Sequence, residues 1–450
     1  METAQNKIVK AALLGAGTVG SGVYQLVQER QEDFSHICGT QIQITKILVR
    51  DASKEREGIP SPLLTDNWNE IIEDDSISII IEVMGGIEPA KSYLLEAMKA
   101  GKQIVTANKD LIAEHGHELL DSAEKYGCDF KFEAAVAGCV PIIQVLKQSM
   151  SSENITEVMG IVNGTTNYIL TRMTQSGMSY DEALKEATDL GYAEADPTAD
   201  VDGLDAGRKI AIMASIAFHS RVTFSDVYIE GIRNITAKDI FYAKEFNSVI
   251  KLVGIARKDE DGIEVKVLPI LIPQDHPLAT VNDSFNAVFV HGTASDDTMY
   301  YGRGAGKRPT ASAVTGDLCT VARHIVEKHS NLHVCSCYKE LPVKNIQDTP
   351  VIEVWHNDGD QVLAYRRKNL IFVFNFNPTK SFTDYGFLVP VGAYDVVLNT
   401  DATAFGGNGL ADDSIRHFTN FDPLYKKDKK EWLKLYLPAR SAVVLKKVKE

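Results

Sequence analysis

A lysine and an aspartate with helical spacing are the residues of this chain best placed to move a proton. Asp205 and Lys209 are four residues apart and precede the nearly all-apolar segment 210–218. Residues at this spacing share one face of an α-helix, and the apolar segment predicts that the helix is buried. A partly desolvated lysine can donate a proton near neutral pH. The structural alternative is an exposed ion pair, worth about 0.3–0.5 kcal/mol.

Acidic residues are dense around this pair. The run 194–205 holds five carboxylates, which are those of Glu194, Asp196, Asp200, Asp202 and Asp205. Their density beside one lysine and a predicted core helix favours a functional cluster over a solvated charged face. We therefore expect the five acids to converge on Lys209.

Two further positions could carry chemistry. Lys109 ends the run Thr106-Ala107-Asn108-Lys109, which begins at the end of a predicted strand, 103–106. Doubly wound sheets bind ligands at such strand ends, although a lysine there can equally be a surface residue at a helix start. Cys139 could be the nucleophile of an acylating dehydrogenase. Because no histidine lies near it in the sequence, a small buried thiol is the favoured interpretation.

A glycine-rich turn predicts nucleotide binding. Gly15-Ala16-Gly17-Thr18-Val19-Gly20 joins a predicted strand at 8–14 to a helix at 19–31. In this context Gly15 makes the turn, Gly17 lets the backbone approach a pyrophosphate, and Gly20 permits helix–strand packing. The helix N-terminus then faces the phosphate charge. The pattern is typical of a dinucleotide-binding domain.

The choice of dinucleotide depends on the end of the second predicted strand, 42–49. Arg50 can hold a 2′-phosphate, which favours NADP, whereas Asp51 leaves NAD open; Arg50 could also be only a surface charge.

A second glycine-rich run at 302–307 is not a Walker loop, because Arg308 follows its lysine. It could be another cofactor-contacting helix start or a plain hinge.

Strand and helix signals alternate through the first 140 residues. Such alternation implies right-handed βαβ crossovers and a mostly parallel sheet with helices on both faces. Longer helices mixed with strands follow, and the C-terminal part is aromatic-rich with short alternating runs. The sequence therefore predicts an α/β fold with a Rossmann-type domain over 1–140, an α+β catalytic domain over 141–325, a linker over 326–350 and an all-β sandwich over 351–450.

Composition excludes several other classes of protein. The 450 residues are 44% hydrophobic and 24% charged, and 47 basic against 61 acidic residues leave a net charge of −14. This charge disfavours nucleic-acid binding. No apolar run approaches the length needed to span a membrane; the near-continuous run 77–84 is too short and contains Glu82. With six cysteines and a polar N-terminal segment, we expect a soluble cytoplasmic protein without a signal peptide.

Residues 1 to about 345 resemble the homoserine dehydrogenases. The most specific match is ATDLGYA at 187–193, continued by Asp196-Pro197, Asp200-Val201, Gly203, Asp205 and Lys209. Further matches are EVMGG at 82–86, TANK at 106–109, NGTTNY at 163–168, GAG at 304–306 and PTA at 309–311. The resemblance implies reversible NAD(P)H-dependent reduction of L-aspartate 4-semialdehyde to L-homoserine, within threonine, methionine and isoleucine biosynthesis.

The resemblance also implies a role for each matching residue. Lys209 would protonate the alkoxide, Asp205 would orient Lys209 and the substrate, and Lys109 would lie near the nicotinamide. The implied substrate-binding residues are Glu194, which would bind the amino group, with Lys109, Asp200, Gly164 and Thr165. The implied cofactor-binding residues are Gly15, Gly17, Thr18, Val19, Gly20, Arg50, Gly85, Thr106, Lys109 and Gly306.

A structural monovalent cation is implied as well. Its ligands would be the Glu133 side chain and the backbone carbonyls of Val136, Gly138 and Val140, and all-oxygen ligation suits Na⁺. Glycine is common in this family where Cys139 stands, which weakens the nucleophile hypothesis. The family further implies a homodimer that pairs its sheets, and a segment 302–325 that returns to pack on the nucleotide domain.

From about Thr349 the chain instead resembles the terminal β-sandwich of glycogen branching enzymes, in runs at 359–365, 370–378, 395–401 and 436–441. A glycosidase barrel with paired carboxylates does not accompany it, so no branching chemistry is expected. Its Trp355, Tyr365, Phe405 and Trp432 could stack on a glucan, but we expect most of them to fill the core. Two competing hypotheses are a carbohydrate-associated protein with a non-catalytic dehydrogenase scaffold and an acylating semialdehyde dehydrogenase.

Overall fold

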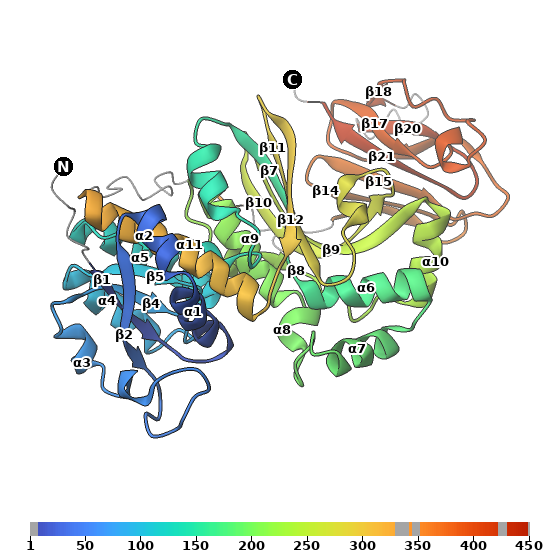
Figure 1. The fold of residues 1–450 in the computed structure, drawn as a ribbon. Helices are drawn as coiled ribbons and strands as arrows, with labels where there is room; N and C mark the ends of the chain where they lie inside the picture. The colour runs from blue at the N-terminus through green and yellow to red at the C-terminus, as the bar shows by residue number, and fades with distance from the viewer. Residues whose placement is uncertain (1–7, 329–341, 344–351, 422–429, 449–450) are drawn as a thin grey trace. The chain divides into compact units, whose positions relative to one another are not determined.

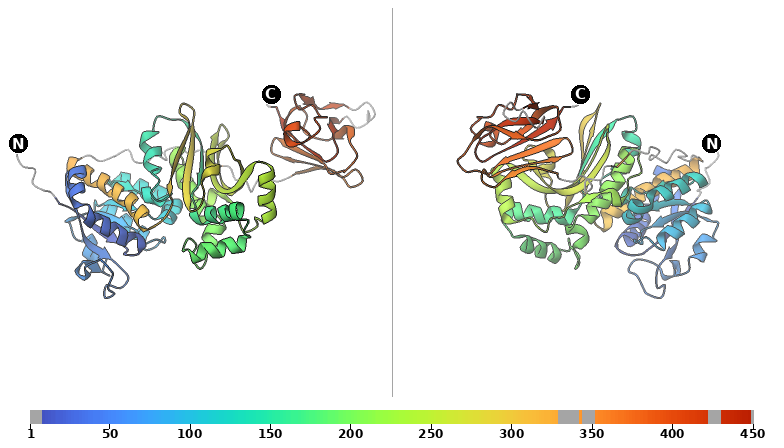
Figure 2. Two further views of the ribbon diagram at one scale, coloured as in Figure 1. Left: turned by 45° about the vertical axis from the view of Figure 1, so that its right-hand side comes forward. Right: turned by 180° about the vertical axis from the view of Figure 1, so that it is seen from behind.

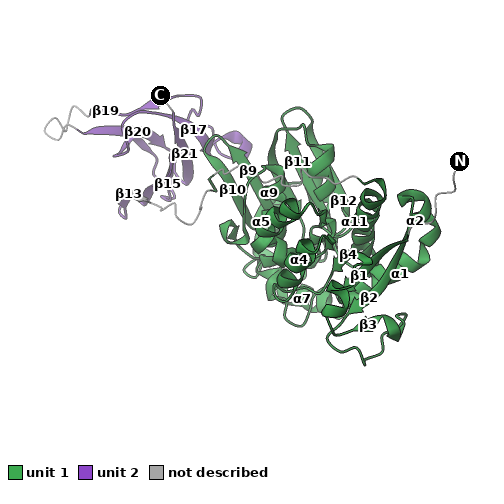
Figure 3. Ribbon diagram, turned by 90° about the vertical axis from the view of Figure 1, so that its left-hand side faces the viewer, with its two compact units in different colours: residues 1–345 green, residues 346–450 purple. Residues whose placement is uncertain are grey.

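The computed structural model of the chain describes residues 8–328, 342–343, 352–421 and 430–448. It contains two compact units, Met1–Asn345 and Ile346–Glu450, coloured separately in Figure 3. Most of the predicted linker, 326–350, lies outside the described residues. Pro342 and Val343 are described: the Pro342 carbonyl accepts a hydrogen bond from the Ile263 amide, and Val343 forms a bridge with Ile263.

The N-terminal part of the first unit is the predicted doubly wound sheet (Figure 1). Its strands run in the order β3-β2-β1-β4-β5-β6, and all of them are parallel. The strands are β1 (Ile8–Leu14), β2 (Gln41–Leu48), β3 (Leu64–Thr65), β4 (Ile77–Glu82), β5 (Gln103–Thr106) and β6 (Phe130–Lys131). The helices are α1 (Thr18–Glu29), α2 (Gln31–Cys38), α3 (Asn69–Ile72), α4 (Ala90–Lys99) and α5 (Lys109–Tyr126).

Alternating apolar residues of β1 bury both faces of this sheet. Ala12 and Leu14 join a core with α4 and α5, whereas Ala11 and Leu13 join a second core with α1 and α2. Side chains of successive strand residues point to opposite faces, so a continuous apolar strand such as β1 requires helices on both sides. This arrangement confirms the Rossmann-type fold class.

The second half of the unit is a mixed sheet in the order β12-β11-β7-β9-β10-β8. One face is covered by α6, α9 and α10, with α7 packed on α6, and a smaller apolar cluster that includes Leu278 lies on the other face. The strands are β7 (Ile155–Ile161), β8 (Tyr228–Ile229), β9 (Ser248–Asp259), β10 (Gly262–Pro273), β11 (Phe285–Gly292) and β12 (Asp296–Arg303). The helices are α6 (Gly164–Ser176), α7 (Tyr180–Asp189), α8 (Thr198–Val201), α9 (Leu204–Ala217) and α10 (Ala237–Glu245).

The last helix of the first unit, α11 (Lys307–Glu327), returns to the nucleotide-binding sheet. It packs along α1, and its Val314 and Leu318 are fully buried in the core that α1 and α2 share with β1. Figure 2 shows this helix beside the N-terminal helices in both views. The helix begins four residues before the predicted apolar segment 311–325, so Lys307 and Arg308 belong to its first turn.

The second unit is a β-sandwich, as predicted. One sheet has the order β13-β14-β15-β21-β17-β18 and the other β16-β20-β19, and their pairs are antiparallel. The strands are β13 (Ile352–Asn357), β14 (Val362–Arg367), β15 (Leu370–Asn375), β16 (Phe382–Phe387), β17 (Ala393–Asn399), β18 (His417–Phe418), β19 (Asn420–Phe421), β20 (Glu431–Leu437) and β21 (Ser441–Lys447).

The expectation that most of four named aromatic residues fill this core is wrong. Phe405 and Trp355 are exposed, and Tyr365 and Trp432 are only partly buried. The core is instead built from residues such as Phe387, Tyr394 and Leu445. Tyr365 packs flat against Phe372, with ring centroids 4.8 Å apart, because alternate residues of β14 and β15 point away from the core.

No helix in the described part of the chain is long and apolar enough to cross a membrane.

Candidate active site

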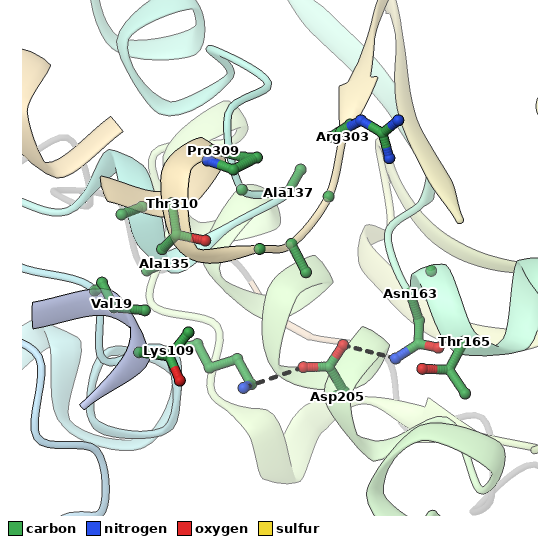
Figure 4. Close-up of a pocket in the computed structure, with 18 of the residues that line it drawn as sticks. Val19, Lys109, Ala135, Ala137, Asn163, Thr165, Asp205, Arg303, Pro309 and Thr310 are labelled. Carbon is green, nitrogen blue, oxygen red and sulfur yellow. Dashed lines mark hydrogen bonds and ion pairs between the residues drawn. The ribbon is translucent and has the colours of Figure 1, made fainter. Parts of the chain in front are cut away.

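A cavity of about 850 Å³ lies between the two sheets of the first unit. Its lining comes from the strand ends and helix starts of both sheets, including Thr18 and Val19 on α1, Lys109 on α5, Asp205 and Lys209 on α9, and Pro309 and Thr310 on α11. Figure 4 shows Val19 and Asn163 on opposite sides of it, with Lys109 and Asp205 between them. Elements far apart in the sequence therefore meet at one ligand-sized site.

Asp205 is the centre of the polar groups in the cavity. Its Oδ2 lies 2.6 Å from the Lys209 Nζ and its Oδ1 lies 3.3 Å from the Lys109 Nζ. Asn163 Nδ2 donates to Oδ2 at 2.9 Å and to Asp200 Oδ1 at 2.7 Å. The spacing of Asp205 and Lys209 along α9 makes the first ion pair, as the sequence predicts, whereas the second joins α9 to α5.

The charges of this cluster stabilise one another. Burial alone would raise the pKa of Asp205, but the Lys209 and Lys109 ammonium groups outweigh it and hold that pKa well below the ordinary range. Burial would likewise lower the pKa of Lys109, but the charges of Asp205 and Asp110 raise it above the usual lysine value. At neutral pH the site therefore holds an anionic carboxylate flanked by a protonated Lys109.

The predicted substrate-binding residues come together at this cavity. Glu194, Asp200, Gly164 and Thr165 all line it, and burial raises the pKa of Asp200. The Thr165 hydroxyl donates to the Tyr192 carbonyl at 2.7 Å, which fixes the start of α6 against the loop after α7.

The expected convergence of five acids on Lys209 is wrong for two of them. Asp196 and Asp202 do not line the cavity. The Asp202 carboxylate is partly exposed and forms an ion pair with Arg233, and Asp196 Oδ1 accepts a hydrogen bond from the Thr198 amide at 3.1 Å. Gly203, with a φ of 82°, lies between these two acids and the start of α9, so neither is on the helix that carries Asp205 and Lys209.

The predicted cofactor residues divide into two groups. Thr18, Val19, Gly85, Lys109 and Gly306 line the cavity. The others do not line it, and they are Gly15, Gly17, Gly20, Arg50 and Thr106. Thr106 is fully buried at the end of β5, whereas the Arg50 side chain is exposed two residues after the end of β2.

The glycines of the first turn have different local surroundings. A Cβ on Gly20 would lie 2.1 Å from the Gly15 carbonyl oxygen, and Gly15 itself has a φ of 102°. A Cβ on Gly17 would have no heavy atom within 4 Å. Gly15 and Gly20 are therefore required by the fold, whereas space at Gly17 is open for a ligand.

Alanine substitutions should separate these two requirements. Gly17→Ala is expected to leave the melting temperature unchanged and to raise the nucleotide Kd about tenfold, because the methyl group would occupy the space of the pyrophosphate. Gly20→Ala is expected to destabilise the fold by about 1–3 kcal/mol through its clash with Gly15. Thermal melts of both variants measure the fold stability, and nucleotide titrations measure the Kd. Equal loss of stability in the two would contradict it.

The loop after β6 carries the predicted cation ligands. The buried Glu133 carboxylate accepts backbone N–H groups of Ile142 and Ile143 on Oε1, at 2.6 and 2.8 Å, and of Gln144 on Oε2 at 2.8 Å. Burial raises the pKa of Glu133, and the buried Asp317 carboxylate accepts from the Glu133 amide at 2.7 Å. Two acidic side chains thus share one buried region.

The interpretation of Cys139 as a small buried thiol is wrong. Its side chain is exposed, and its Sγ lies 3.3 Å from the Arg303 carbonyl oxygen. Cys139 does not line the cavity, although the adjacent Gly138 does. This placement gives no support to a nucleophilic role.

Asn163, Asp110 and Glu82 have clear structural roles that the sequence did not predict. Asn163 caps α6 through a hydrogen bond from the Thr166 amide and also binds both Asp200 and Asp205. Asp110 forms an ion pair with Arg208 at 2.7 Å, which ties α5 to α9. Glu82 ends β4 as a buried acid. An asparagine before a helical pattern is a recognisable capping signal, but its bonds to distant acids leave no mark in the sequence.

Comparison with known proteins agrees with this geometry. The family model described as "Homoserine dehydrogenase, NAD binding domain" matches residues 15–133, and the model "Homoserine dehydrogenase" matches residues 141–319. Homoserine dehydrogenase of Bacillus subtilis is 49% identical over 320 residues, which are 71% of this chain and 74% of the relative. The chain belongs to the homoserine dehydrogenase family.

Other family members extend the comparison. Homoserine dehydrogenase of Corynebacterium glutamicum is 49% identical over 346 residues, covering 76% of this chain and 78% of that protein. The crystal structure of the family member from Thiobacillus denitrificans superposes with a TM-score of 0.69 at 39% identity, over 78% of this chain and 84% of that one. A hyperthermophilic archaeal homoserine dehydrogenase, solved with NADPH, has a TM-score of 0.60 at 28% identity. The match covers 72% of this chain and 100% of that one.

The C-terminal unit matches a different family of domains. Residues 353–448 match the model described as "Alpha amylase, C-terminal all-beta domain". The predicted resemblance of this unit to the terminal sandwich of a glucan-active enzyme is thereby confirmed at the level of the domain family.

Proposed function

We propose that this chain is a homoserine dehydrogenase that interconverts L-aspartate 4-semialdehyde and L-homoserine with a nicotinamide cofactor. The observation that carries the proposal is the Lys209–Asp205–Lys109 ion-pair cluster inside the cavity. Reduction of an aldehyde creates negative charge on its oxygen, and positioned ammonium groups stabilise and then neutralise that charge.

Lys209 is the proposed proton donor. Two of its three N–H bonds point to fixed acceptors, the Val162 carbonyl at 2.7 Å and Asp205 Oδ2 at 2.6 Å. An ammonium has three donors, so one remains for a substrate oxygen in the cavity. Asp205 holds the ammonium in place, and Lys109 adds a second positive charge on the other carboxylate oxygen. The bound reduced nicotinamide supplies the hydride.

The substrate itself would be held on the α6 and α8 side of the cavity. Glu194 and Asp200 are carboxylates that line this side, and they suit the amino group of an amino-acid substrate. Gly164 and Thr165 stand at the start of α6, where backbone N–H groups favour a carboxylate. The amino and carboxylate groups on the α-carbon of homoserine thus both have complementary groups on this side of the cavity.

A direct assay tests the proposal. The purified protein is incubated with L-homoserine and NADP⁺ or NAD⁺, and the absorbance of the reduced nicotinamide is followed. We expect turnover that the Lys109→Ala/Lys209→Ala double variant lacks. A protein that binds nucleotide but gives no turnover would favour the carbohydrate-associated scaffold, and turnover that requires phosphate and is abolished by alkylation of Cys139 would favour an acylating dehydrogenase.

NADP is the cofactor that we propose over NAD. Arg50 lies two residues after the end of β2 with an exposed side chain, where the ribose of a bound dinucleotide is expected. The neighbouring Asp51 carboxylate accepts from the Ser53 amide at 3.0 Å and from its hydroxyl at 2.6 Å, so part of its acceptor capacity is already used. An exposed guanidinium beside a carboxylate whose acceptor capacity is partly used favours a 2′-phosphate.

Arg50→Ala should reveal this preference. The KM for NADP⁺ is expected to rise about tenfold while the kcat/KM with NAD⁺ changes less than twofold, because only the 2′-phosphate contact is lost. Arg30→Ala, which removes an exposed arginine paired with Asp33, serves as the control. An equal change with both nucleotides, or none with either, would rule out the contact.

A Na⁺ ion bound by Glu133 and the carbonyls of Val136, Gly138 and Val140 fits the donor chemistry of the loop. Three N–H groups use three of the four acceptor positions of the Glu133 carboxylate, and one on Oε2 is left. A hard cation accepts this all-oxygen set. Its contribution would be structural, because it would offset the charge of a buried carboxylate.

We also propose a homodimer in the cytoplasm. The second sheet presents exposed apolar side chains, among them Leu271, Met299 and Tyr301, on strands β10 and β12. Such side chains on a sheet suit pairing with a second copy.

The exposed aromatic residues of the C-terminal unit, such as Phe405, leave glucan binding as a second candidate activity of that unit alone.

A further inference from the structure

Glu82 is a buried acid that binds two cavity loops at once. It is the last residue of β4 and is fully buried. Its Oε1 accepts from the amides of Met84 at 2.8 Å and Gly85 at 3.3 Å, and its Oε2 accepts from the Thr106 hydroxyl at 2.6 Å. Asn108 Nδ2 also reaches Oε1 at 3.4 Å. One carboxylate therefore joins the loop after β4 to the loop after β5.

These two loops form one wall of the cavity. Val83, Met84 and Gly85 line it from the first loop, and Ala107, Asn108 and Lys109 line it from the second. The strands β4 and β5 that precede them are parallel neighbours in the first sheet, labelled in Figure 1. Glu82 does not line the cavity, so it can act on a ligand only through the residues that it holds.

A continuous series of hydrogen bonds leads from Glu82 to the first turn of α5, the helix that begins at Lys109. The Thr106 hydroxyl accepts from the Asn108 amide at 3.0 Å while donating to Glu82. Asn108 Nδ2 donates to the Gly86 carbonyl at 2.7 Å, and its Oδ1 accepts from the Leu111 amide at 3.1 Å, which caps α5. Because α5 begins at Lys109, this cap sets the direction in which the Lys109 side chain leaves the helix.

We propose that Glu82 is a positioning residue that fixes the cofactor-facing loop 83–86 and directs the Lys109 ammonium toward Asp205. The part of this inference that concerns turnover rests on the proposed dehydrogenase function, whereas the part that concerns nucleotide binding does not. All four groups that reach Glu82 donate to it, so the site requires an acceptor at both oxygens. A carboxylate meets this requirement and an amide of the same shape does not.

Glu82→Gln is the variant that tests this role. It keeps the volume of the side chain but turns one acceptor into a donor that faces the donors already present. Glu82→Asp keeps the charge and withdraws it by one methylene. Asp129→Asn is the matched control, because Asp129 is also a buried acid of this domain, bound at 2.7 Å by His324 and outside the cavity lining.

The first measurement is nucleotide binding. The Kd of NADPH for Glu82→Gln is expected to rise about tenfold, whereas that of 2′,5′-ADP, which lacks the nicotinamide half, should change less than twofold. If the wild-type protein prefers NADH, then NADH and ADP replace this pair. Equal weakening of both probes would show a general structural effect and would overturn the proposal, as would no weakening of either.

The second measurement is turnover with L-homoserine. We expect kcat to fall about 10–100-fold in Glu82→Gln, with a smaller change in the KM of homoserine and a larger primary deuterium isotope effect on kcat, because misplacement of Lys109 and the nicotinamide slows hydride transfer itself. Asp129→Asn should keep the wild-type kcat and isotope effect. A wild-type kcat in Glu82→Gln would contradict the proposed role of Glu82.

The outcomes remain separable if a variant is unstable or the proposed reaction is absent. If Glu82→Gln does not fold, Glu82→Asp tests the positioning role with the same nucleotide probes. If neither variant folds, Glu82 belongs to the core and the positioning role is overturned. Should the wild-type protein give no turnover with homoserine, the proposed function fails, whereas the comparison of NADPH with 2′,5′-ADP still tests Glu82.

Discussion

Lys209→Met is expected to lower kcat for homoserine oxidation about a thousandfold while the nucleotide Kd changes less than twofold. Loss of a positioned general acid or base costs about 10²–10⁴ in rate, and we expect the middle of this range for Lys209, whose side chain is only 12% exposed and is tied to Asp205. Methionine retains the apolar stem and removes the three donors. The first glycine turn, which leads into α1, is untouched, and this preserves nucleotide binding.

Steady-state kinetics and nucleotide titration of the same preparation measure the two effects. Lys244→Met provides the control, because Lys244 is an exposed lysine on α10 and does not line the cavity. Wild-type turnover in Lys209→Met would remove Lys209 from the mechanism. A parallel loss of nucleotide binding would instead indicate a collapsed site.

Asp205→Asn is expected to reduce kcat about 10²–10³-fold, because it leaves two adjacent ammonium groups without their shared counterion. Removing one member of a buried charge cluster lowers the free energy of unfolding by about 3–5 kcal/mol. Asp205 is such a member, because it is buried between Lys209 and Lys109. The amide keeps the shape and one acceptor, so the fold should persist. Asp202→Asn, on a partly exposed acid three residues earlier that is paired with Arg233, should keep wild-type turnover.

The pH dependence of Asp205 has a definite sign. Its pKa in the folded protein is held below the unfolded value, so its contribution to stability is fully present above about pH 4 and is lost as pH falls through the lower folded pKa. Thermal melts between pH 3 and 7 should therefore show a steeper acid loss in the wild type than in Asp205→Asn. Identical acid limbs would show that the carboxylate is not stabilised by the two lysines.

Local patterns in the sequence were sufficient for much of the fold and for part of the site. The strand at 8–14 and the strand at 103–106 have the predicted bounds, because apolar runs end at glycine or at a polar turn. The Asp205–Lys209 pair follows from helical spacing alone. Both features depend on residues close together in the chain.

Contacts between distant segments of the chain could not be predicted from local sequence patterns. The ion pair of Lys109 with Asp205 joins residues 96 positions apart, and its existence depends on how α5 packs against α9. Asp202 has the same residue type as Asp205 and lies only three positions earlier, yet it stands before α9 and pairs with Arg233. Exposure of Cys139 and of Phe405 likewise depends on which neighbours the fold supplies.

The return of α11 to the nucleotide-binding sheet has a consequence during synthesis. The apolar surface made by Val9, Ala11 and Leu13 of β1 shares its core with Val314 and Leu318, about three hundred residues later in the chain. While a ribosome translates the intervening segment, a nascent chain holds this surface without the helix that will cover it. The dinucleotide-binding half can therefore complete its core only after residue 327 has emerged, and until then it presents a hydrophobic face to chaperones.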